Sequence, residues 1–415
     1  MRPPSLKSSF QVNTLLEIAN QFGTPTYVYD ERIIRQQCQL LKKHLTGIHT
    51  RLLYAMKANS HPAILEIIRS EGFGIDAVSP GELYLAQKVG FSPEEILYTA
   101  NNITDEEMHL TQKAGVLLNV GELSRLERFG QSYPGGDICI RLNPQIGSGH
   151  HEHVITAGKT TKFGIPVHEI SKVLDIANRY HVRITGIHQH IGSGISSMKV
   201  LGEAIGVLLK HAADFPDLQF VNIGGGFNIP YHPDDTPIDF ENFHTSIVSL
   251  LKDTNEKANQ KLEYWFEPGR FLVAESGALL VRSNTIKEAN GRTFAGTDSG
   301  MNQLIRPALY QAYHEIFNVS NAQASPSSYE IVGNICESGD IFAKNRSVQQ
   351  IREGDILAIF DAGAYGIAMA SIYNLRPFPA EVLIREDRSI TCIRTRQSPE
   401  DLIHTMFASY FDDAS

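Results

Sequence analysis

The sequence predicts an α/β protein that consists of a (β/α)8 barrel of the TIM type and a second, β-rich domain. Eight short apolar runs rich in β-branched residues lie between about residues 50 and 270, and each is followed by a stretch with helical periodicity. After about residue 275 the pattern changes to alternating strands separated by Gly, Asn and Asp. We therefore expect a barrel at 31–275 and a β-rich domain at 276–415, with the N-terminal segment 1–30 packed on the latter.

The eight expected strands follow one another at the spacing of β-α units. They are Arg51–Met56, Phe73–Ala77, Ile96–Ala100, Val116–Asn119, Ile138–Leu142, Ile184–His188, Gln219–Ile223 and Tyr264–Phe266. Helices are expected between them, for example at Pro62–Ser70, Pro80–Val89 and Ile170–Tyr180. Eight units in about 220 residues fit a closed barrel, whereas a doubly wound open sheet usually has fewer strands and a glycine-rich dinucleotide turn after the first.

Further elements are expected before and after the barrel. The first 30 residues contain one helical pattern, TLLEIANQFG, and one strand, PTYVYD, that the eight units leave over, so we expect both to pack on the β-rich domain. The strands expected in that domain include GALLVRSNTIKEA, GRTFAGTDS, SSYEIVGNI, GDILAIF and AEVLIRE.

Composition and charge argue against several classes of protein. A chain of 415 residues with 42% apolar content is long enough to bury one large core and a second, smaller one. A formal charge of -9 without a long basic run argues against nucleic acid or an anionic membrane surface as a partner. No apolar run has the length of a membrane span and the N-terminus lacks a signal-peptide pattern, so we expect a cytoplasmic protein.

The cysteines and histidines do not predict a metal site. The four cysteines are far apart and form no CxxC pair, which favours free thiols over a disulfide framework or a thiolate zinc site. They are Cys38, Cys139, Cys336 and Cys392. The histidines His150, His151 and His153 share one loop, but this loop lacks carboxylate or thiolate partners at ligand spacing.

Chemistry is expected at the carboxyl ends of the barrel strands, where active sites of this fold lie. A purely structural rim does not require ionisable groups and backbone-exposing glycines at these positions. The residues at or just past the expected strands are Lys57, Asp76, Asn101, Arg141, His190, Gly224–Gly226 and Glu267.

Lys57 and a glycine run suggest a Schiff base and a phosphate. Lys57, in YAMKANS, ends an almost wholly apolar strand, where burial would lower the pKa of the amine and leave it nucleophilic. The structural alternative is a lysine that only marks the strand's emergence into solvent. Gly224, Gly225 and Gly226 allow backbone N–H groups to approach an anion closely, although tight turns use glycine as well. The run does not fit the P-loop pattern GxxxxGKS/T, so a nucleoside triphosphate is not expected.

Three further positions suit an aromatic cofactor. His190, in HQHIGSG, can lie flat against a ring while the Ser193 hydroxyl donates to a phosphate; a histidine satisfied in the core is the alternative. Glu267, in FEPGR, can hold a pyridine nitrogen protonated, or else form an ordinary salt bridge with Arg270. Cys336, in NICESGD, can protonate a carbanion, whereas a buried inert cysteine is the commoner case.

These motifs occur together in one known family. YAMKANS, DAVSPGEL, HQHIGSG, GGGF, EPGR, MNQLIRPALYQAYHEI, CESGD and AYGIAMASIYNLRPFPAEV stand here in the order found in diaminopimelate decarboxylases, of the alanine-racemase-like class of pyridoxal-phosphate enzymes. The chain resembles this family from Gly23 to its last strands, and RPALY with CESGD is the most specific part. The departures are small: Gly194 stands where glutamine is more usual, and Ser299 where alanine or glycine is usual.

The resemblance implies pyridoxal 5'-phosphate as the cofactor and decarboxylation of meso-2,6-diaminopimelate to L-lysine, the last step of lysine biosynthesis. Lys57 would bind the cofactor aldehyde, His190 would stack on its ring and Glu267 would contact its pyridine nitrogen, while Cys336 would be the proton donor. The other residues that the resemblance places around the cofactor are Asp76, Arg141, Ser193, Gly224, Gly225, Gly226, Gly269, Arg270 and Tyr365.

The resemblance also assigns the far end of the substrate. The residues implied there are Arg270, Arg306, Tyr310, Glu337 and Tyr365. Two guanidiniums bind a carboxylate bidentately, a geometry with no use for the cationic distal ends of ornithine, lysine or arginine. The family's Cys336–Glu337 loop reaches into the neighbouring subunit's site, so a head-to-tail homodimer with shared active sites is implied.

Other functions remain as alternatives. A decarboxylase for a carboxylated polyamine precursor or for a basic D-amino acid is the nearest one. A racemase is disfavoured, because two-base chemistry uses a tyrosine opposite the lysine and has no use for the pair Arg270 and Arg306. A non-catalytic cofactor carrier usually has the barrel alone, and the β-rich domain argues against it.

Overall fold

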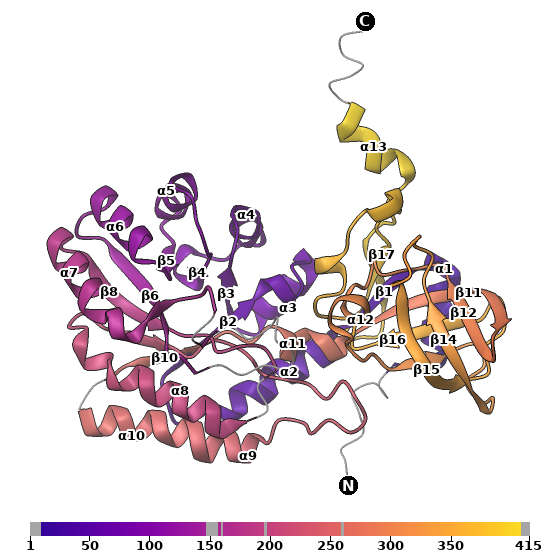
Figure 1. The fold of residues 1–415 in the computed structure, drawn as a ribbon, viewed down its shortest axis with the longest axis horizontal. Coiled ribbons are helices and arrows are strands. Elements are labelled where there is room, and N and C mark those ends of the chain that lie inside the picture. Colours follow the sequence, from indigo (N-terminus) through magenta and orange to yellow (C-terminus); the bar gives the residue numbers. More distant parts are fainter. Residues whose placement is uncertain (1–9, 147–156, 159–160, 195–196, 259–260, 408–415) are drawn as a thin grey trace, which may run out of the picture. The chain divides into compact units, whose positions relative to one another are not determined.

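The computed structural model describes residues 10–146, 157–158, 161–194, 197–258 and 261–407 (Figure 1). It divides the chain into two compact units. The β unit comprises Met1–Ile34, Pro230–Asp235 and Leu272–Ser415, and the barrel unit comprises Arg35–Ile229 and Thr236–Phe271. The chain therefore passes between the units several times.

The barrel unit contains a closed parallel barrel, as predicted. Each strand pairs in parallel with the next, and the last one, β10, pairs with β2, which closes the sheet. The strands that the described chain contributes are β2 (Thr50–Ala55), β3 (Gly74–Ala77), β4 (Ile96–Tyr98), β5 (Leu117–Val120), β6 (Asp137–Asn143), β8 (Arg183–His188), β9 (Phe220–Asn222) and β10 (Glu263–Phe266). All eight expected strands are confirmed. A two-residue strand, β7 (Ile165–Pro166), pairs with the end of β6.

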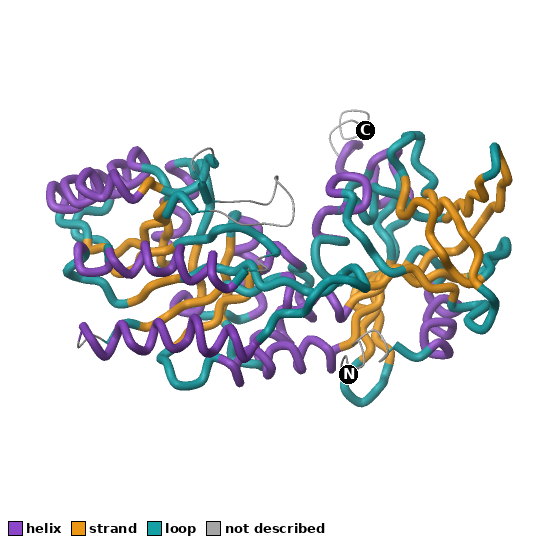
Figure 2. Tube along the Cα trace, turned by 60° about the horizontal axis from the view of Figure 1, so that its bottom comes forward, coloured by secondary structure: helices purple, strands orange, loops and turns teal. Residues whose placement is uncertain are grey.

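Helices cover the outside of the barrel (Figure 2). The helices of this part of the chain are α2 (Glu31–His44), α3 (Pro62–Ser70), α4 (Pro80–Val89), α5 (Asp105–Lys113), α6 (Leu123–Ser132), α7 (Ile170–Tyr180), α8 (Met198–Lys210), α9 (Phe240–Phe243) and α10 (Ser249–Ala258), and α11 (Arg270–Val273) follows the last barrel strand. Local chemistry sets their ends. In α4 the Ser79 hydroxyl accepts a hydrogen bond from the N–H of Glu82 at 3.2 Å, and Gly90 ends the helix in the left-handed conformation.

The barrel interior is packed with side chains. Leu53, Leu97, Cys139, Phe220 and Trp265 come from five strands and form one buried cluster, in which the rings of Phe220 and Trp265 stack at 3.7 Å. A Cβ on the neighbouring Gly186 would lie 2.0 Å from the Phe220 ring, so this strand position requires glycine. The barrel is therefore filled at this level, as expected for an eight-stranded barrel.

The β unit is built on a sheet that includes the N-terminal strand. Its strands are β1 (Thr26–Asp30), β11 (Gly277–Ala289), β12 (Arg292–Thr297), β13 (Ile316–Asn318), β14 (Pro326–Val332), β15 (Ile341–Gln349), β16 (Ile356–Phe360), β17 (Ala380–Ile384) and β18 (Ile390–Arg394), and its helices are α1 (Val12–Phe22), α12 (Arg306–Tyr310) and α13 (Pro399–Phe407). β1 lies between β11, to which it is antiparallel, and β17, to which it is parallel. Figure 1 shows indigo β1 and α1 among orange strands.

The core of the β unit joins both ends of the chain. Buried Leu15 and Ile18 of α1 and Val28 of β1 pack with Ala358 of β16 and Val382 of β17. Because these apolar side chains alternate along strands that share one face, burying them holds α1 against the sheet.

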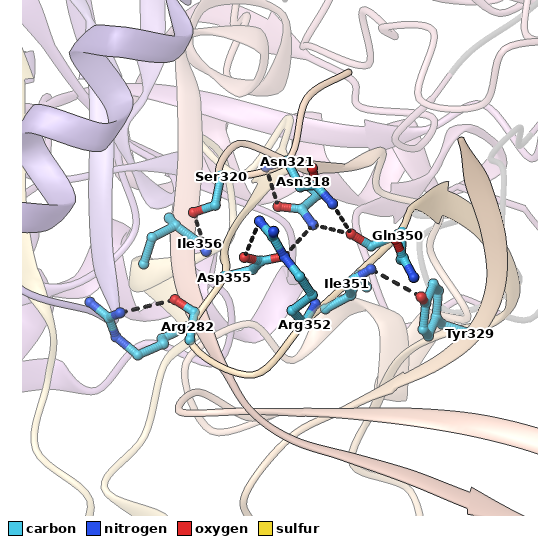
Figure 3. Close-up of polar contacts among 11 residues, drawn as sticks. Arg282, Asn318, Ser320, Asn321, Tyr329, Gln350, Ile351, Arg352, Asp355 and Ile356 are labelled. Atoms are coloured by element: carbon cyan, nitrogen blue, oxygen red, sulfur yellow. Dashed lines mark hydrogen bonds and ion pairs between the residues drawn. The ribbon is translucent and has the colours of Figure 1, made fainter. Parts of the chain in front are cut away.

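A polar network fixes the turn that precedes β16 (Figure 3). The Asp355 carboxylate accepts hydrogen bonds from the Arg352 side chain and from Asn318 Nδ2 at 2.9 Å, and these bonds lower the pKa of Asp355 although burial opposes them. Ser320 Oγ accepts from the N–H of Ile356 at 2.9 Å, and Arg282 donates to the Gly354 carbonyl at 3.0 Å. The register of β16 against β11 and β13 is thus fixed from its first residue.

Candidate active site

Predicted site residues lie at or near the carboxyl ends of six barrel strands. Lys57 lies in a 3-10 turn, Met56–Ala58, directly after β2. Asp76 and Arg141 lie near the ends of β3 and β6, where their side chains are buried. The remaining residues follow β8, β9 and β10, and they are His190, Ser193, Gly224, Gly225, Gly226, Glu267, Gly269 and Arg270.

Lys57 faces a buried carboxylate. Its Nζ lies 3.5 Å from Asp76 Oδ2, and its side chain is 42% exposed, so the expectation that this amine is buried is wrong. The apolar strand β2 ends at Ala55, two residues before Lys57, and the 3-10 turn carries the side chain outward. Burial raises the pKa of Asp76 to about 7, helped by the negative charge of Glu267 and opposed by Lys57. Asp76 Oδ1 is buried and has no hydrogen-bond partner among the described residues.

Glu267 is a buried carboxylate that stays ionised. His188 Nε2 lies 3.1 Å from one of its oxygens, and Asn222 Nδ2 donates to the other at 2.7 Å. Burial alone would raise the pKa of Glu267, but His188 and Lys57 lower it to about 2. The hydrogen-bond partners of Glu267 are therefore two neighbouring barrel residues, and not Arg270, which was the structural alternative for this carboxylate.

Arg270 instead contacts the loop after β8. Its Nη2 donates to Ser193 Oγ at 3.1 Å, which joins two of the predicted residues. Gly269, one residue earlier, packs close to β2, where an added Cβ would lie 3.1 Å from the Cβ of Ala55. A side chain at Gly269 would therefore push against the strand that carries Lys57.

The glycine run after β9 requires glycine for steric reasons. Gly224 has a φ of +79°, and a Cβ there would lie 2.3 Å from the carbonyl oxygen of Gln189. A Cβ on Gly225 would lie 2.3 Å from the carbonyl oxygen of Glu267. Two of the three amides already donate within the chain: that of Gly224 to Asn222 Oδ1 at 2.8 Å, and that of Gly225 to His190 Nδ1 at 3.2 Å.

His190 is a neutral imidazole with a defined tautomer. The Gly225 amide can only donate, so Nδ1 accepts and the proton of the neutral ring is on Nε2. Burial and the positive charges of Lys57 and Arg141 hold the pKa of His190 well below its usual value. The ring is thus uncharged at neutral pH and fixed at one edge.

Arg141 is a buried cation with unused hydrogen-bonding capacity. Its guanidinium lies 4.9 Å from the centre of the Phe163 ring. Burial lowers the pKa of Arg141, and the charges of Glu267 and Asp76 partly offset this effect. Arg141 Nη2 is buried without a hydrogen-bond partner among the described residues, an arrangement that a polar ligand would satisfy.

The other predicted residues belong to the β unit. Arg306 begins α12 and is 1% exposed, and Tyr310 ends the same helix. Tyr365 follows β16 with a left-handed φ of 56°. Cys336 and Glu337 are exposed, and Glu337 accepts a hydrogen bond from Tyr373 Oη at 2.5 Å.

Asp340 braces the loop that carries Cys336. One oxygen of the Asp340 carboxylate accepts from the N–H of Met301 at 2.6 Å and the other from the N–H of Ile335 at 2.7 Å. Gly333 must be glycine, because a Cβ there would lie 2.3 Å from the same carboxylate. The CESGD motif is therefore a braced turn, in which the aspartate holds the loop and leaves the thiol exposed.

Two residues of the site, His188 and Asn222, are not predicted by the sequence pattern. His188 and Asn222 both hold Glu267, yet each lies inside an expected strand rather than past its end. A signal was available in HQH, because residues two apart in a strand point to the same face, so His188 shares the side of His190.

The described residues contain no cluster of His, Cys, Asp and Glu that could hold a metal ion. The loop with His150, His151 and His153 lies outside the described residues. Within the part of the chain that the structure describes, no helix is both long and apolar enough to cross a membrane.

Known proteins that are similar to this chain include decarboxylases. The family model of the pyridoxal-binding domain of pyridoxal-dependent decarboxylases matches residues 31–274. The diaminopimelate decarboxylase of Methanothermobacter thermautotrophicus is 43% identical over 398 residues, which cover 94% of this chain and 92% of that protein. The enzyme of the same name from Escherichia coli K12 is 33% identical over 416 residues, which cover 96% and 97%. The crystal structure of diaminopimelate decarboxylase from Helicobacter pylori complexed with L-lysine superimposes with a TM-score of 0.87 at 32% identity, over 95% of this chain and 99% of that one.

Proposed function

The chain belongs to the diaminopimelate decarboxylase family of pyridoxal-dependent decarboxylases, and from this premise we propose that it converts meso-2,6-diaminopimelate to L-lysine and CO2. The observation that carries the proposal is the carboxylate of Glu267, held ionised by His188 and Asn222 on the same barrel rim as Lys57. An acid with these two partners is suited to a protonated pyridine nitrogen.

The residues of the barrel rim fit pyridoxal 5'-phosphate. Buried Asp76 Oδ1 and Arg141 Nη2 have no partner among the described side chains, and the glycine run provides a backbone surface that side chains would block. When bound, the cofactor supplies an electron-poor ring that accepts the electron pair left by departing CO2. The residues that would hold it are Lys57, Asp76, Arg141, His190, Ser193, Gly224, Gly225, Gly226, Glu267, Gly269, Arg270 and Tyr365.

Each side chain of the rim has a task in this proposal. The Lys57 amine is the group that would hold the cofactor through its aldehyde. Glu267 would keep a proton at the pyridine nitrogen, because a carboxylate with a pKa of about 2 is negative at neutral pH. Neutral His190 offers a flat ring without adding a positive charge that would compete for Glu267.

Guanidinium groups are proposed to recognise the distal carboxylate of the substrate. In the proposal Arg270 and Arg306 bind it, Tyr310 and Tyr365 contribute hydroxyl groups, and Glu337 binds the distal ammonium. Two planar donors match a carboxylate in geometry and charge, which favours diaminopimelate over substrates with a cationic end only.

Cys336 is the proposed proton donor. It stands exposed in a turn that Asp340 braces, so its thiol can hand a proton to the carbon that has lost CO2 and take another from solvent. We propose a homodimer in which this thiol and Glu337 complete the partner's site. Four cysteines in the thiol form support a cytoplasmic location.

A coupled assay tests the proposed function. The purified protein is given meso-diaminopimelate with and without added pyridoxal phosphate, and CO2 and lysine are measured together. We expect equal amounts of both products and a dependence on the cofactor. Release of CO2 from a carboxylated polyamine precursor or from D-lysine, with none from diaminopimelate, would instead establish one of the alternative decarboxylases.

A further inference from the structure

The β unit holds the guanidinium of Arg306 in a rigid frame. Arg306 Nη1 lies 2.8 Å from His314 Nε2, and both side chains are buried. The guanidinium carbon lies 4.4 Å from the centre of the Tyr231 ring, which meets the His314 ring edge-on at 5.6 Å. Arg306 is therefore fixed by an edge contact with one ring and a face contact with another.

The hydrogen bonds of His314 define its tautomer. His314 Nδ1 lies 2.8 Å from the carbonyl oxygen of Phe360, which can only accept, so Nδ1 carries the proton. A guanidinium can only donate, so Nε2 must be the acceptor for Arg306. A neutral ring with its proton on Nδ1 satisfies both neighbours, and neither the other tautomer nor the protonated ring does.

The backbone of His314 is held as well. Arg346 Nη1 donates to the His314 carbonyl oxygen at 2.6 Å, and the guanidinium of Arg346 lies 3.8 Å from the centre of the Tyr313 ring. This contact ties the segment after α12 to β15, and the bond to Phe360 ties it to the end of β16. The acceptor that faces Arg306 is thus anchored at the side chain and at the backbone.

We propose that His314 is a positioning residue for substrate recognition: as a neutral acceptor it aims the Arg306 guanidinium at the distal carboxylate of the substrate. This inference rests on the proposed function, in which Arg306 binds that carboxylate. His314 touches neither substrate nor cofactor in this account, and its effect is on specificity rather than on the chemical step. A guanidinium with a free choice of rotamer would lose much of its bidentate geometry.

Two substitutions separate the two hydrogen bonds of His314. In His314→Gln the side-chain oxygen can occupy the place of Nε2 and keep an acceptor for Arg306. In His314→Asn the shorter amide can still donate to the Phe360 carbonyl but does not reach Arg306. Tyr329→Phe is the matched control, because it removes a different buried contact of the β unit, in which Tyr329 Oη accepts from the N–H of Ile351 at 3.0 Å.

The experiment compares binding with and without the distal carboxylate. In the holoenzyme, kcat and KM for meso-diaminopimelate are measured, together with competitive inhibition by L-lysine, which keeps that carboxylate, and by cadaverine, which lacks it. Thermal unfolding of each variant is followed in parallel. For His314→Asn we expect KM and the inhibition constant of L-lysine to rise about tenfold, with kcat and cadaverine inhibition changed less than about threefold. His314→Gln and Tyr329→Phe should stay close to the wild type in all four constants.

Other results would overturn the inference. If His314→Asn weakens L-lysine and cadaverine equally, or if His314→Gln is as defective as His314→Asn while both fold, His314 has only a structural role. A wild-type enzyme that does not act on diaminopimelate at all refutes the proposed function and this inference together. An active wild type with an unchanged ratio of the two inhibition constants in His314→Asn refutes the inference alone.

Discussion

At the scale of single residues, the site depends on two buried carboxylates with opposite pKa shifts. Glu267 is held near pKa 2 by His188 and its neighbours, whereas Asp76 is raised to about 7 by burial. Both lie on the same barrel rim, so the difference comes from their partners: Glu267 has two hydrogen-bond donors, and Asp76 has a lysine at 3.5 Å. Neighbouring acidic groups whose pKa values are shifted in opposite directions are typical of catalytic sites.

His188 can be tested through the pH dependence of the reaction. His188→Leu removes one of the donors that lower the pKa of Glu267, so this pKa should rise by about one to two units. Because Glu267 is proposed to hold the pyridine proton in its ionised form, the acid limb of the kcat profile should move to higher pH by a similar amount. His188→Gln keeps an N–H donor and should restore most of the wild-type profile. An acid limb that stays in place in His188→Leu would show that His188 does not control Glu267.

The raised pKa of Asp76 predicts how the free energy of unfolding depends on pH. Its folded pKa of about 7 exceeds its ordinary value of 3.8, so the folded chain binds more protons, and stability falls as pH rises from 3.8 to 7. Asp76→Asn removes this loss, and the cofactor-free protein should become more stable at pH 8, by at most about 4 kcal/mol, with little change near pH 4. Urea unfolding at both pH values measures the difference. An equal effect at the two pH values would contradict the assigned shift, and decarboxylation should be lost in the variant.

Sequence reasoning located most site residues as polar exceptions at or past the ends of apolar strands, and it missed His188 and Asn222. Lys57, His190 and Glu267 follow apolar runs and are visible as exceptions to them. His188 and Asn222 replace apolar residues within short strands, and only the closed barrel brings both to Glu267. The exposure of Lys57 was mispredicted, because the 3-10 turn after β2 has no signature in the sequence.

At the scale of elements, the loop after β9 links the two ends of the proposed cofactor. Asn222 donates to Glu267 with its amide nitrogen and accepts from the Gly224 amide with its oxygen. The carboxylate proposed to contact the pyridine nitrogen and the loop proposed to contact the phosphate are therefore fixed by one side chain. A displacement of the loop should therefore also change the position of the Glu267 carboxylate.

Gly224→Ala tests this element. The new Cβ would meet the Gln189 carbonyl at 2.3 Å, and the left-handed φ of +79° disfavours alanine as well, so the loop must shift. We expect the dissociation constant of pyridoxal phosphate to rise at least about tenfold, measured by titrating the cofactor-free protein. Gly206→Ala in α8 is the control, because nothing lies within 4 Å of its Cβ, and it should leave cofactor binding unchanged and stabilise the helix by about 0.5–1 kcal/mol. Equal cofactor affinity in both variants would contradict the role of the loop.

The elements that the sequence predicted are those with a strong apolar pattern. The barrel strands and helices α3, α4 and α7 follow it closely. β13, β15 and β18 were not predicted, because β13 has three residues, most of β15 is solvent-accessible and no residue of β18 is fully buried. Such strands are fixed by pairing with neighbours rather than by their own composition.

At the scale of the whole molecule, the order of the strands along the chain differs from their order in the sheet. β1 comes first in the sequence but lies between β11 and β17, near the other end of the chain. The residues of the β unit in the proposed site could not be deduced from strand ends, and they followed only from the resemblance of RPALY and CESGD to a known family. The local pattern of apolar residues predicts the barrel. The pairing of strands that are far apart in the sequence, and the site residues proposed in the β unit, require a structure or a known relative.

The proposed shared sites of the homodimer can be tested by mixing two inactive variants. Lys57→Ala lacks the amine of one subunit, and Cys336→Ala lacks the thiol that is proposed to serve the partner. Dimers that contain one subunit of each kind have one intact site, so free exchange of subunits should restore about one quarter of the wild-type activity. No recovery after verified subunit exchange would show that Lys57 and Cys336 serve the same subunit's site.

The central claim is that Lys57 at the mouth of the barrel binds the cofactor aldehyde. Borohydride reduction of the holoprotein makes such a bond permanent, and peptide mass spectrometry then identifies the modified lysine. We predict a pyridoxyl group on Lys57 alone, no such group when the cofactor is removed before reduction, and no label in the Lys57→Ala variant. A stable label on another lysine, with Lys57 unmodified in active enzyme, would contradict the account.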